Sequence, residues 1–198
     1  MFLVFDTETT GVPGSFRAPV SDVDNWPRVV QLAWAAFGVC GRRALSRSDV
    51  IRPDGVPIAC ALQALITPLT AASIVVAHNW EFDAKVLGAE FHRLKLPDPF
   101  PRKTSICTMQ STTVYCAIPN RYGFKWPKLE ELHVRLFGRE PDHAHDAAAD
   151  VAACSKCLFE LRRLGIVPLP GLDGTTCSTC RAALKQLDVV CTVVPPVY

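Results

Sequence analysis

The feature that most constrains this chain is an apolar stretch near the N-terminus that runs directly into two acids. Residues 2–11 read FLVFDTETTG, in which four apolar residues precede Asp6 and Glu8. A strand that is apolar on both faces is typical of the covered centre of a sheet. Side chains two residues apart point to the same side of a strand, so the two acids share one face at its carboxyl end, where open α/β sheets place their sites.

Two carboxylates this close repel each other, and one of them keeps its proton unless a cation lies between them. Ligand sets made only of oxygen atoms favour Mg²⁺ or Mn²⁺ over zinc or copper. An Asp-x-Glu pair also occurs in ordinary surface turns, so Asp6 and Glu8 alone leave both interpretations open.

The pattern of the remaining chain predicts an α/β layered domain with a mixed sheet, because early strands in series are followed by alternating strands and helices. Residues 12–28 contain three prolines and are predicted to form a loop. Residues 1–165 are expected to form this domain, and residues 166–198, rich in Pro, Gly, Cys and Val, an appendage. Further strands are predicted at 29–37, 44–52, 73–79 and 105–110. One helix is predicted from residue 57 until Pro68, and a second follows the strand at 73–79 and continues to about residue 94. Two more helices are predicted at 127–138 and at about 146–164.

Composition narrows the class of protein. Apolar residues make up 49% of the 198 residues and charged residues 20%, which is typical of a globular domain. No apolar run approaches the roughly 20 residues of a membrane helix, and the N-terminus lacks the pattern of a signal peptide. We therefore expect a soluble intracellular protein of the cytoplasm or nucleus, not secreted and not bound to a membrane.

The net charge of +2 is too small to indicate a nucleic-acid partner by itself. Two local groups of basic residues are more suggestive, although a solvated basic face explains each group equally well. The groups are Arg93, Lys95, Arg102 and Lys103, and Arg121, Lys125 and Lys128.

Two later segments add acids. AHNWEFDAKVL (77–87) places Asp83 just inside a helix that follows a buried strand, where a carboxylate also suits the helix dipole. HAHDAAADV (143–151) places Asp146 and Asp150 on one helix face, at about 100° per residue. His145 and Asp150 act together only if the helix begins around Asp146, which is then a natural N-cap.

Three motifs in this order, DTETTG, HNWEFD and HDAAAD, resemble the three exonuclease motifs of the DEDDh family. The third motif of that family, H-x-A-x-x-D, selects His145, Ala147 and Asp150, and the second ends in Phe-Asp, here residues 82–83. The stretches NWPRVVQLAW and YGFKWPKLEELHVRLFG also resemble segments of stand-alone exonucleases of this kind. The likeness covers roughly residues 1–165.

The resemblance implies a ribonuclease-H-like exonuclease fold, a mixed five-stranded sheet flanked by helices, with two divalent ions, Mg²⁺ or Mn²⁺, at the strand tip. By carry-over, Asp6, Glu8 and Asp150 are ligands of the first ion. Asp6 also bridges to the second ion, which Asp83 holds largely through water. His145 takes the proton from the attacking water, since its pKa lies near neutrality.

The activity implied by the family is 3′–5′ exonucleolytic hydrolysis of phosphodiester bonds at a nucleic-acid 3′ end, releasing nucleoside monophosphates. Our leading prediction is action on DNA in proofreading or repair, with a polymerase or another replication or repair protein as partner in trans. The alternative is an exoribonuclease of the oligoribonuclease or ribonuclease T type. Thr9 is expected to contact the terminal sugar. A non-catalytic module that keeps the fold as a platform belongs to a different class.

Nine cysteines without a secretion signal indicate free thiols in a reducing compartment. Nineteen residues separate the pairs Cys154–Cys157 and Cys177–Cys180, a spacing compatible with zinc binding and with a zinc-stabilised interaction module. Against zinc, the first pair lies in the middle of a predicted helix, whereas structural zinc pairs usually lie on tight knuckles. Buried thiols without a metal are the alternative. The scattered residues Cys40, Cys60, Cys107 and Cys116 are expected to be small core residues.

Overall fold

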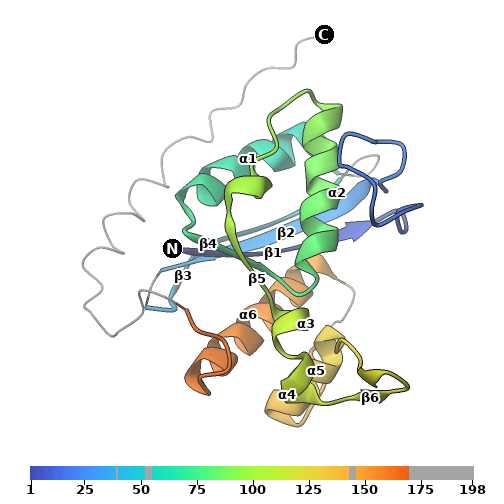
Figure 1. Cartoon of the computed structure of the whole chain (residues 1–198). Helices are drawn as coiled ribbons and strands as arrows, with labels where there is room; N and C mark the ends of the chain where they lie inside the picture. The colour runs from blue at the N-terminus through green and yellow to red at the C-terminus, as the bar shows by residue number, and fades with distance from the viewer. Residues whose placement is uncertain (39, 52–54, 143–145, 170–198) are drawn as a thin grey trace.

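A mixed five-stranded sheet lies at the centre of the computed structural model, with helices packed on both faces (Figure 1). The strand order is β3-β2-β1-β4-β5; β1 pairs antiparallel with β2 and parallel with β4. This arrangement confirms the predicted mixed sheet. The structure describes residues 1–38, 40–51, 55–142 and 146–169. No helix in those ranges is both long enough and apolar enough to cross a bilayer.

The strands and helices follow the predicted order closely. The strands of the main sheet are β1 (Phe2–Thr9), β2 (Val29–Phe37), β3 (Arg43–Val50), β4 (Ile74–Ala77) and β5 (Thr104–Cys107). A small hairpin consists of β6 (Pro119–Asn120) and β7 (Gly123–Phe124). The helices are α1 (Ile58–Ala71), α2 (Trp80–Arg93), a 3-10 turn (Phe100–Arg102), α3 (Thr108–Ser111), α4 (Thr113–Cys116), α5 (Leu129–Phe137) and α6 (Ala147–Arg163).

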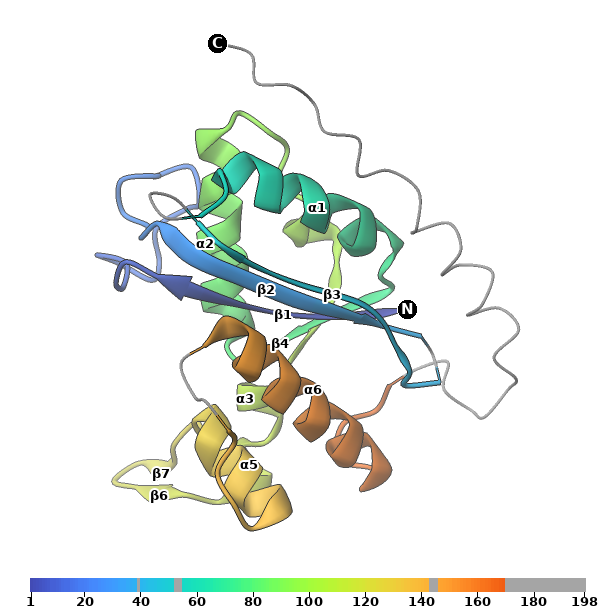
Figure 2. The ribbon, with the colours of Figure 1, turned by 180° about the vertical axis from the view of Figure 1, so that it is seen from behind.

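Strand β1 divides the protein into two hydrophobic cores. Leu3 and Phe5 are buried in the core beneath α1 and α2. Phe2 and Val4 are buried in the core beneath α5 and α6. Figures 1 and 2 show these two helix layers on opposite faces of the sheet. Because side chains alternate along a strand, β1 carries apolar residues on both faces until it reaches its acidic tip.

Helix α6 begins where the sequence predicts. Asp146 is its N-cap, and its Oδ1 atom accepts hydrogen bonds from the backbone amides of Ala148 and Ala149, both at 3.0 Å. The helix ends before Gly165, whose φ of +71° is the left-handed conformation common just after a helix. Val167 and Leu169 beyond it are buried in the core beneath α6. The predicted boundary of the domain at residue 165 stays a prediction, since residues 170–198 lie outside the described ranges.

Two predicted element boundaries are wrong. Helix α1 does not stop at Pro68 but continues to Ala71, because Leu65 and Leu69 are fully buried on one side of it and this packing outweighs the hydrogen bond that proline cannot make. The strand expected at 105–110 is β5, which ends at Cys107 because Thr108 begins a helical turn.

None of the four scattered cysteines is fully buried in a core, although Cys116 packs against the core beneath α5 and α6. Cys40 and Cys60 are exposed, and Cys107 and Cys116 are half-buried. Cys60 lies on the outer side of α1, whose apolar residues point to the sheet. The position of a residue on its helix, and not its intrinsic apolar character, decides its burial here.

Candidate metal centre at the carboxyl end of strand β1

Three carboxylates meet at the end of β1. Oxygen atoms of Asp6, Glu8 and Asp150 all lie within 4.8 Å of one another. Asp6 and Glu8 share the face of β1 that packs against α6, and Asp150 lies in the first turn of α6. Within the described ranges, no other group of three or more potential metal-ligating side chains is gathered this closely. The donor set is purely carboxylate oxygen, which fits Mg²⁺ or Mn²⁺.

The site is electrostatically unfavourable for its own charges. The pKa of Asp6 is raised well above its ordinary value, first by burial and then by the negative charges of Asp83, Asp150 and Glu8. Burial and like charges both penalise the ionised carboxylate. A bound divalent cation removes this penalty, so the arrangement favours cation binding without requiring a change of fold.

Asp83 reaches the same strand from the other face of the sheet. Its Oδ1 atom accepts a hydrogen bond from the Thr7 hydroxyl at 2.7 Å and another from the Thr7 backbone amide at 3.2 Å. Burial raises the pKa of Asp83 to about 7, and the two bonds from Thr7 partly oppose that shift. Asp83 therefore lies close enough to raise the pKa of Asp6, yet it does not belong to the three-carboxylate group.

Gln31 is a residue at the site that the sequence analysis missed. It lies opposite Glu8 in the β1–β2 register, and its Nε2 atom donates to Oδ2 of Asp146 at 3.0 Å. Its Oε1 atom accepts a hydrogen bond from the backbone amide of Ala147 at 3.3 Å. Gln31 thus ties the first turn of α6 to the sheet. The sequence feature that could have predicted this role is an amide side chain on the same face of β2 as Ala33 and Ala35, which are buried under α6.

Two further residues predicted for the site are Thr9 and His145. The hydroxyl of Thr9 donates to the carbonyl oxygen of Gly11 at 2.7 Å, so it shapes the turn after β1, and its contact with a terminal sugar stays a prediction. His145 lies outside the described residues. Trp80, which lies in the second motif, contacts the rings of Phe5 and Phe100, with centroids 5.7 Å away in both cases, and it packs against the core beneath α1 and α2.

The first cysteine pair is part of the core. Cys154 and Cys157 are both buried on the side of α6 that faces the sheet. Burial raises the pKa of the Cys154 thiol well above its ordinary value and that of Cys157 to about 12, so both thiols are protonated near neutral pH. Cys177 and Cys180 lie outside the described residues, and zinc binding by the two pairs stays a prediction.

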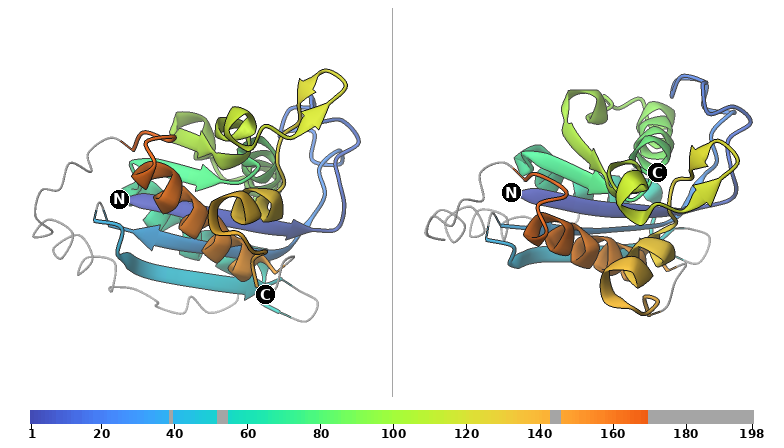
Figure 3. Two further views of the ribbon diagram at one scale, coloured as in Figure 1. Left: turned by 90° about the horizontal axis from the view of Figure 1, so that it is seen from below. Right: turned by 60° about the horizontal axis from the view of Figure 1, so that its bottom comes forward.

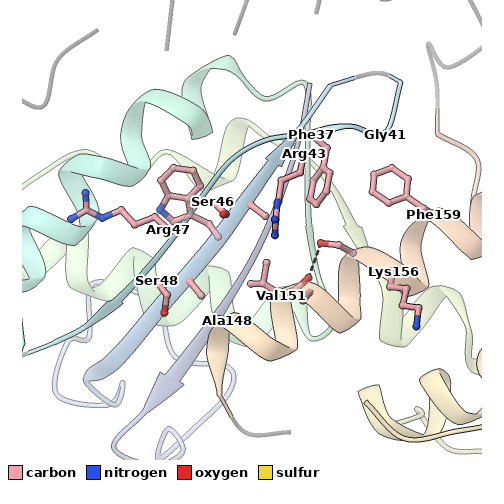
Figure 4. A pocket seen from close by; sticks show the side chains of 15 residues that line it. Phe37, Gly41, Arg43, Ser46, Arg47, Ser48, Ala148, Val151, Lys156 and Phe159 are labelled. Carbon is pink, nitrogen blue, oxygen red and sulfur yellow. Dashed lines mark hydrogen bonds between the residues drawn. The ribbon is translucent and has the colours of Figure 1, made fainter. Parts of the chain in front are cut away.

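A separate groove of about 490 Å³ lies between α6 and strands β2 and β3. Figure 4 shows Phe37, Val151 and Phe159 lining it, with Arg43 and Lys156 at its sides. The described residues that line the groove include no Asp or Glu, so it is distinct from the carboxylate group. The chemistry that the carboxylates can perform lies at the strand end and not in this groove.

The fold is shared with several nucleases of known structure. The nuclease domain of 3′hExo, described as a DEDDh family member bound to rAMP, superimposes with a TM-score of 0.63 at 13% identity, covering 83% of this chain and 92% of that one. E. coli Exonuclease I in complex with a dA16 oligonucleotide has a TM-score of 0.59 at 19% identity, covering 82% of this chain and 40% of that one. Cell-death related nuclease 4 (CRN-4) has a TM-score of 0.57 at 14% identity, covering 83% and 64%.

These likenesses establish the fold class: a mixed five-stranded sheet flanked by helices, as in ribonuclease-H-like exonucleases. The chain spans less than half of E. coli Exonuclease I and somewhat less than two thirds of CRN-4. No protein-family model matches the chain, and no curated protein sequence matches it. Because all three identities are below 20%, the superpositions concern the fold, and the activity has to be argued from the site.

Proposed function

We propose that this protein is a divalent-metal-dependent 3′–5′ exonuclease of the DEDDh type, acting on a nucleic-acid 3′ end. The observation that carries the proposal is the convergence of Asp6, Glu8 and Asp150 within 4.8 Å at the end of β1. Support comes from the order of the three motifs and from a fold shared with a DEDDh nuclease domain and with an exonuclease bound to an oligonucleotide. DNA is the proposed first substrate.

In this proposal Asp6, Glu8 and Asp150 hold a Mg²⁺ or Mn²⁺ ion, and Asp83 helps to hold a second ion through water. The ions, when bound, neutralise charge on the attacking and leaving oxygens of the phosphodiester. Asp146 caps α6, so it fixes the turn that carries Asp150.

The general base in the proposal is His145, which directly precedes Asp146 in the chain. A neutral imidazole accepts a proton from water near neutral pH. The water oxygen bonds to the phosphorus, the bond from phosphorus to the 3′ oxygen breaks, and that oxygen takes up a proton. The products are a nucleoside 5′-monophosphate and a strand shortened by one residue, with a new 3′ hydroxyl.

A purely structural role for the carboxylates is the competing explanation. The raised pKa of Asp6 argues against it, because a structural cluster gains nothing from placing like charges together. The burial of Cys154 and Cys157 likewise gives no support to a zinc-stabilised interaction module built on this pair.

The decisive experiment is digestion of DNA and RNA oligonucleotides of the same sequence, labelled at either end, with Mg²⁺ and with EDTA. We expect mononucleotide release from the 3′ end only with the metal, and the matched substrates assign the sugar preference. Asp6→Asn is the matched inactive control, and it should abolish Mn²⁺ binding by calorimetry together with hydrolysis.

The variant His145→Ala distinguishes the role of the general base from that of the metal ligands. It should keep Mn²⁺ binding and lose most hydrolysis. Purified protein that leaves both sugar types intact with either metal, while Asp6→Asn binds Mn²⁺ normally, would falsify the proposed activity.

A further inference from the structure

The β6–β7 hairpin and the residues that follow it expose aromatic side chains beside basic ones. Tyr122 is 81% exposed, Phe124 50% and Trp126 59%. The segment from residue 119 to 128 reads PNRYGFKWPK, with three aromatic residues, three basic residues and no acid. Scattered exposed apolar residues are ordinary on a protein surface, but three large aromatic rings within five residues indicate a binding surface.

The exposed rings stand on a hairpin that is held in place. The backbone amide of Lys125 donates to the carbonyl of Ile118 at 2.9 Å, and the amide of Tyr122 donates to Oδ1 of Asn120 at 2.8 Å. After the hairpin, the backbone amide of Lys128 donates to Oε2 of Glu131 at 2.8 Å at the start of α5. The aromatic side chains are therefore presented by an ordered turn.

His78 anchors this segment to the sheet. Its Nε2 atom lies 3.0 Å from the carbonyl oxygen of Pro127, and its Nδ1 atom lies 3.0 Å from the hydroxyl of Thr108. A carbonyl can only accept, so Nε2–H donates to Pro127 and Nδ1 accepts from Thr108. Burial lowers the pKa of His78 to about 4, which is consistent with this neutral tautomer.

The anchor places the hairpin at the end of the sheet that carries the carboxylates. His78 directly follows β4, which runs parallel to β1, so the carboxyl ends of the two strands lie at the same edge. Figures 1, 2 and 3 agree in showing the hairpin at the end of the sheet to which β1 points, and Figures 1 and 2 show it on the side of α5 and α6. Asp6 and Glu8 point to that same side of the sheet.

The positive charge of residues 119–128 indicates which kind of ligand binds beside the rings. Arg121 and Lys128 are exposed, and the Arg121 guanidinium lies 4.5 Å from the centre of the Tyr122 ring. Lys125 pairs with Glu131 at 2.5 Å. The other basic group is different: Arg93 binds buried Glu90, and Lys103 donates to two backbone carbonyls, so these two cations are used inside the fold. Of the two basic groups, only the hairpin group combines exposed aromatic rings with exposed cations at the carboxylate end of the sheet.

On the basis of the proposed function, we propose that Tyr122, Phe124 and Trp126 form a stacking surface for unpaired bases of the substrate strand. These bases lie upstream of the bond that is cleaved, and Arg121 and Lys128 contact the phosphates between them. Aromatic rings interleaved with basic residues are the chemistry that binds single strands without sequence preference. A protein partner with an apolar, acidic surface is the competing occupant.

The test compares substrates that reach the hairpin with one that does not. Tyr122→Ala, Phe124→Ala and Trp126→Ala are assayed on a 15-nucleotide single strand and on the p-nitrophenyl ester of thymidine 5′-monophosphate. We expect KM for the long strand to rise about tenfold for each ring removed, with kcat unchanged, since stacking contributes binding and not chemistry. Hydrolysis of the small ester should not change. Tyr122→Phe, which keeps the ring, should restore the KM.

Leu164→Ala is the matched control, because this residue is also exposed but lies at the far end of α6. Binding of the labelled strand in Ca²⁺, followed by fluorescence anisotropy, measures the hairpin without turnover. Unchanged KM and unchanged anisotropy in all three alanine variants overturn the stacking surface and leave the protein partner as occupant. Failure of the proposed function looks different: the wild-type protein then hydrolyses neither substrate, whatever the hairpin binds.

Discussion

The two helices that approach strand β1 from opposite faces use their carboxylates in contrasting ways. On the α2 side, Asp83 accepts two hydrogen bonds from Thr7, and buried Glu90 pairs with Arg28 at 2.9 Å and Arg93 at 3.0 Å. On the α6 side, Asp150 lies with two further carboxylates within 4.8 Å. The chain thus supplies hydrogen-bond donors to Asp83 and Glu90, whereas it places two further carboxylates beside Asp150.

This difference separates the structural acid Glu90 from the acids of the proposed site, which include Asp83 because its charge raises the pKa of Asp6. A buried carboxylate that receives donors from its own chain stabilises the fold, and losing its partner leaves a buried charge. A group of carboxylates destabilises the fold unless a cation binds, and that cation is available for chemistry. The Glu90 network on the α2 side should therefore respond to mutation through stability, and the three-carboxylate group through activity.

The largest effect is expected from Asp150→Asn. It should lower kcat about a thousandfold, equivalent to about 4 kcal/mol in the activation barrier, because a metal ligand is lost. In EDTA its free energy of unfolding should equal or exceed that of the wild type, since one like charge is removed. Mg²⁺ should raise the Tm of the wild type but not of the variant. Asp24→Asn, in the exposed loop before β2, is the control. A variant that unfolds easily in EDTA contradicts the contrast between the two sides.

Arg93→Ala tests the opposite side. The side chain of Glu90 is only 1% exposed, and removing Arg93 leaves it with the exposed Arg28 and the backbone amide of Val29. We expect the free energy of unfolding to fall by about 3 kcal/mol, measured by urea denaturation. The kcat of the protein that remains folded should be unchanged. Arg102→Ala, an exposed residue of the same predicted basic group, should have little effect on either quantity. Equal costs for the two variants contradict a structural role for the Glu90 network.

The smallest effect is expected from Gln31→Ala. This change removes the donor to Asp146 and the acceptor for the Ala147 amide, so the free energy of unfolding should fall by about 1 kcal/mol. A slight shift of the first turn of α6 should lower kcat by about tenfold, with KM unchanged. Ser48→Ala removes the other partner of Gln31 and is the matched control. If the loss of kcat in Gln31→Ala parallels its loss of stability and is restored at a higher Mg²⁺ concentration, Gln31 acts through metal affinity and not by positioning the first turn of α6.

Much of the fold could be predicted because local patterns and tertiary packing agree. The apolar run before Asp6 predicts a central strand, and β1 is buried on both faces. The acidic Asp146 followed by three alanines predicts a helix start, and α6 begins at Ala147. Where packing opposes a local signal the prediction fails, as at Pro68, which is buried inside α1.

The site was predictable in part. Asp6 and Glu8 share a face by the two-residue period of a strand, and the structure brings Asp150 to them. The motif places Asp83 with the same acids; in the structure its carboxylate accepts a hydrogen bond from Thr7 and raises the pKa of Asp6, and its role in holding a second ion stays a prediction. Gln31 was missed because its role depends on the register between two strands and on a helix 116 residues later in the chain.

The sequence by itself determined the strand, its acidic end, the helix starts and the motif order, because these depend on residues a few positions apart. Only the tertiary structure decided that Asp150 joins Asp6 and Glu8 while Asp83 bonds to Thr7. It also decided that two cations of one basic group, Arg93 and Lys103, are used inside the fold, while the other basic group lies beside exposed rings. Such distinctions depend on which face of the sheet each helix covers, and that is set by the packing of two cores against one strand.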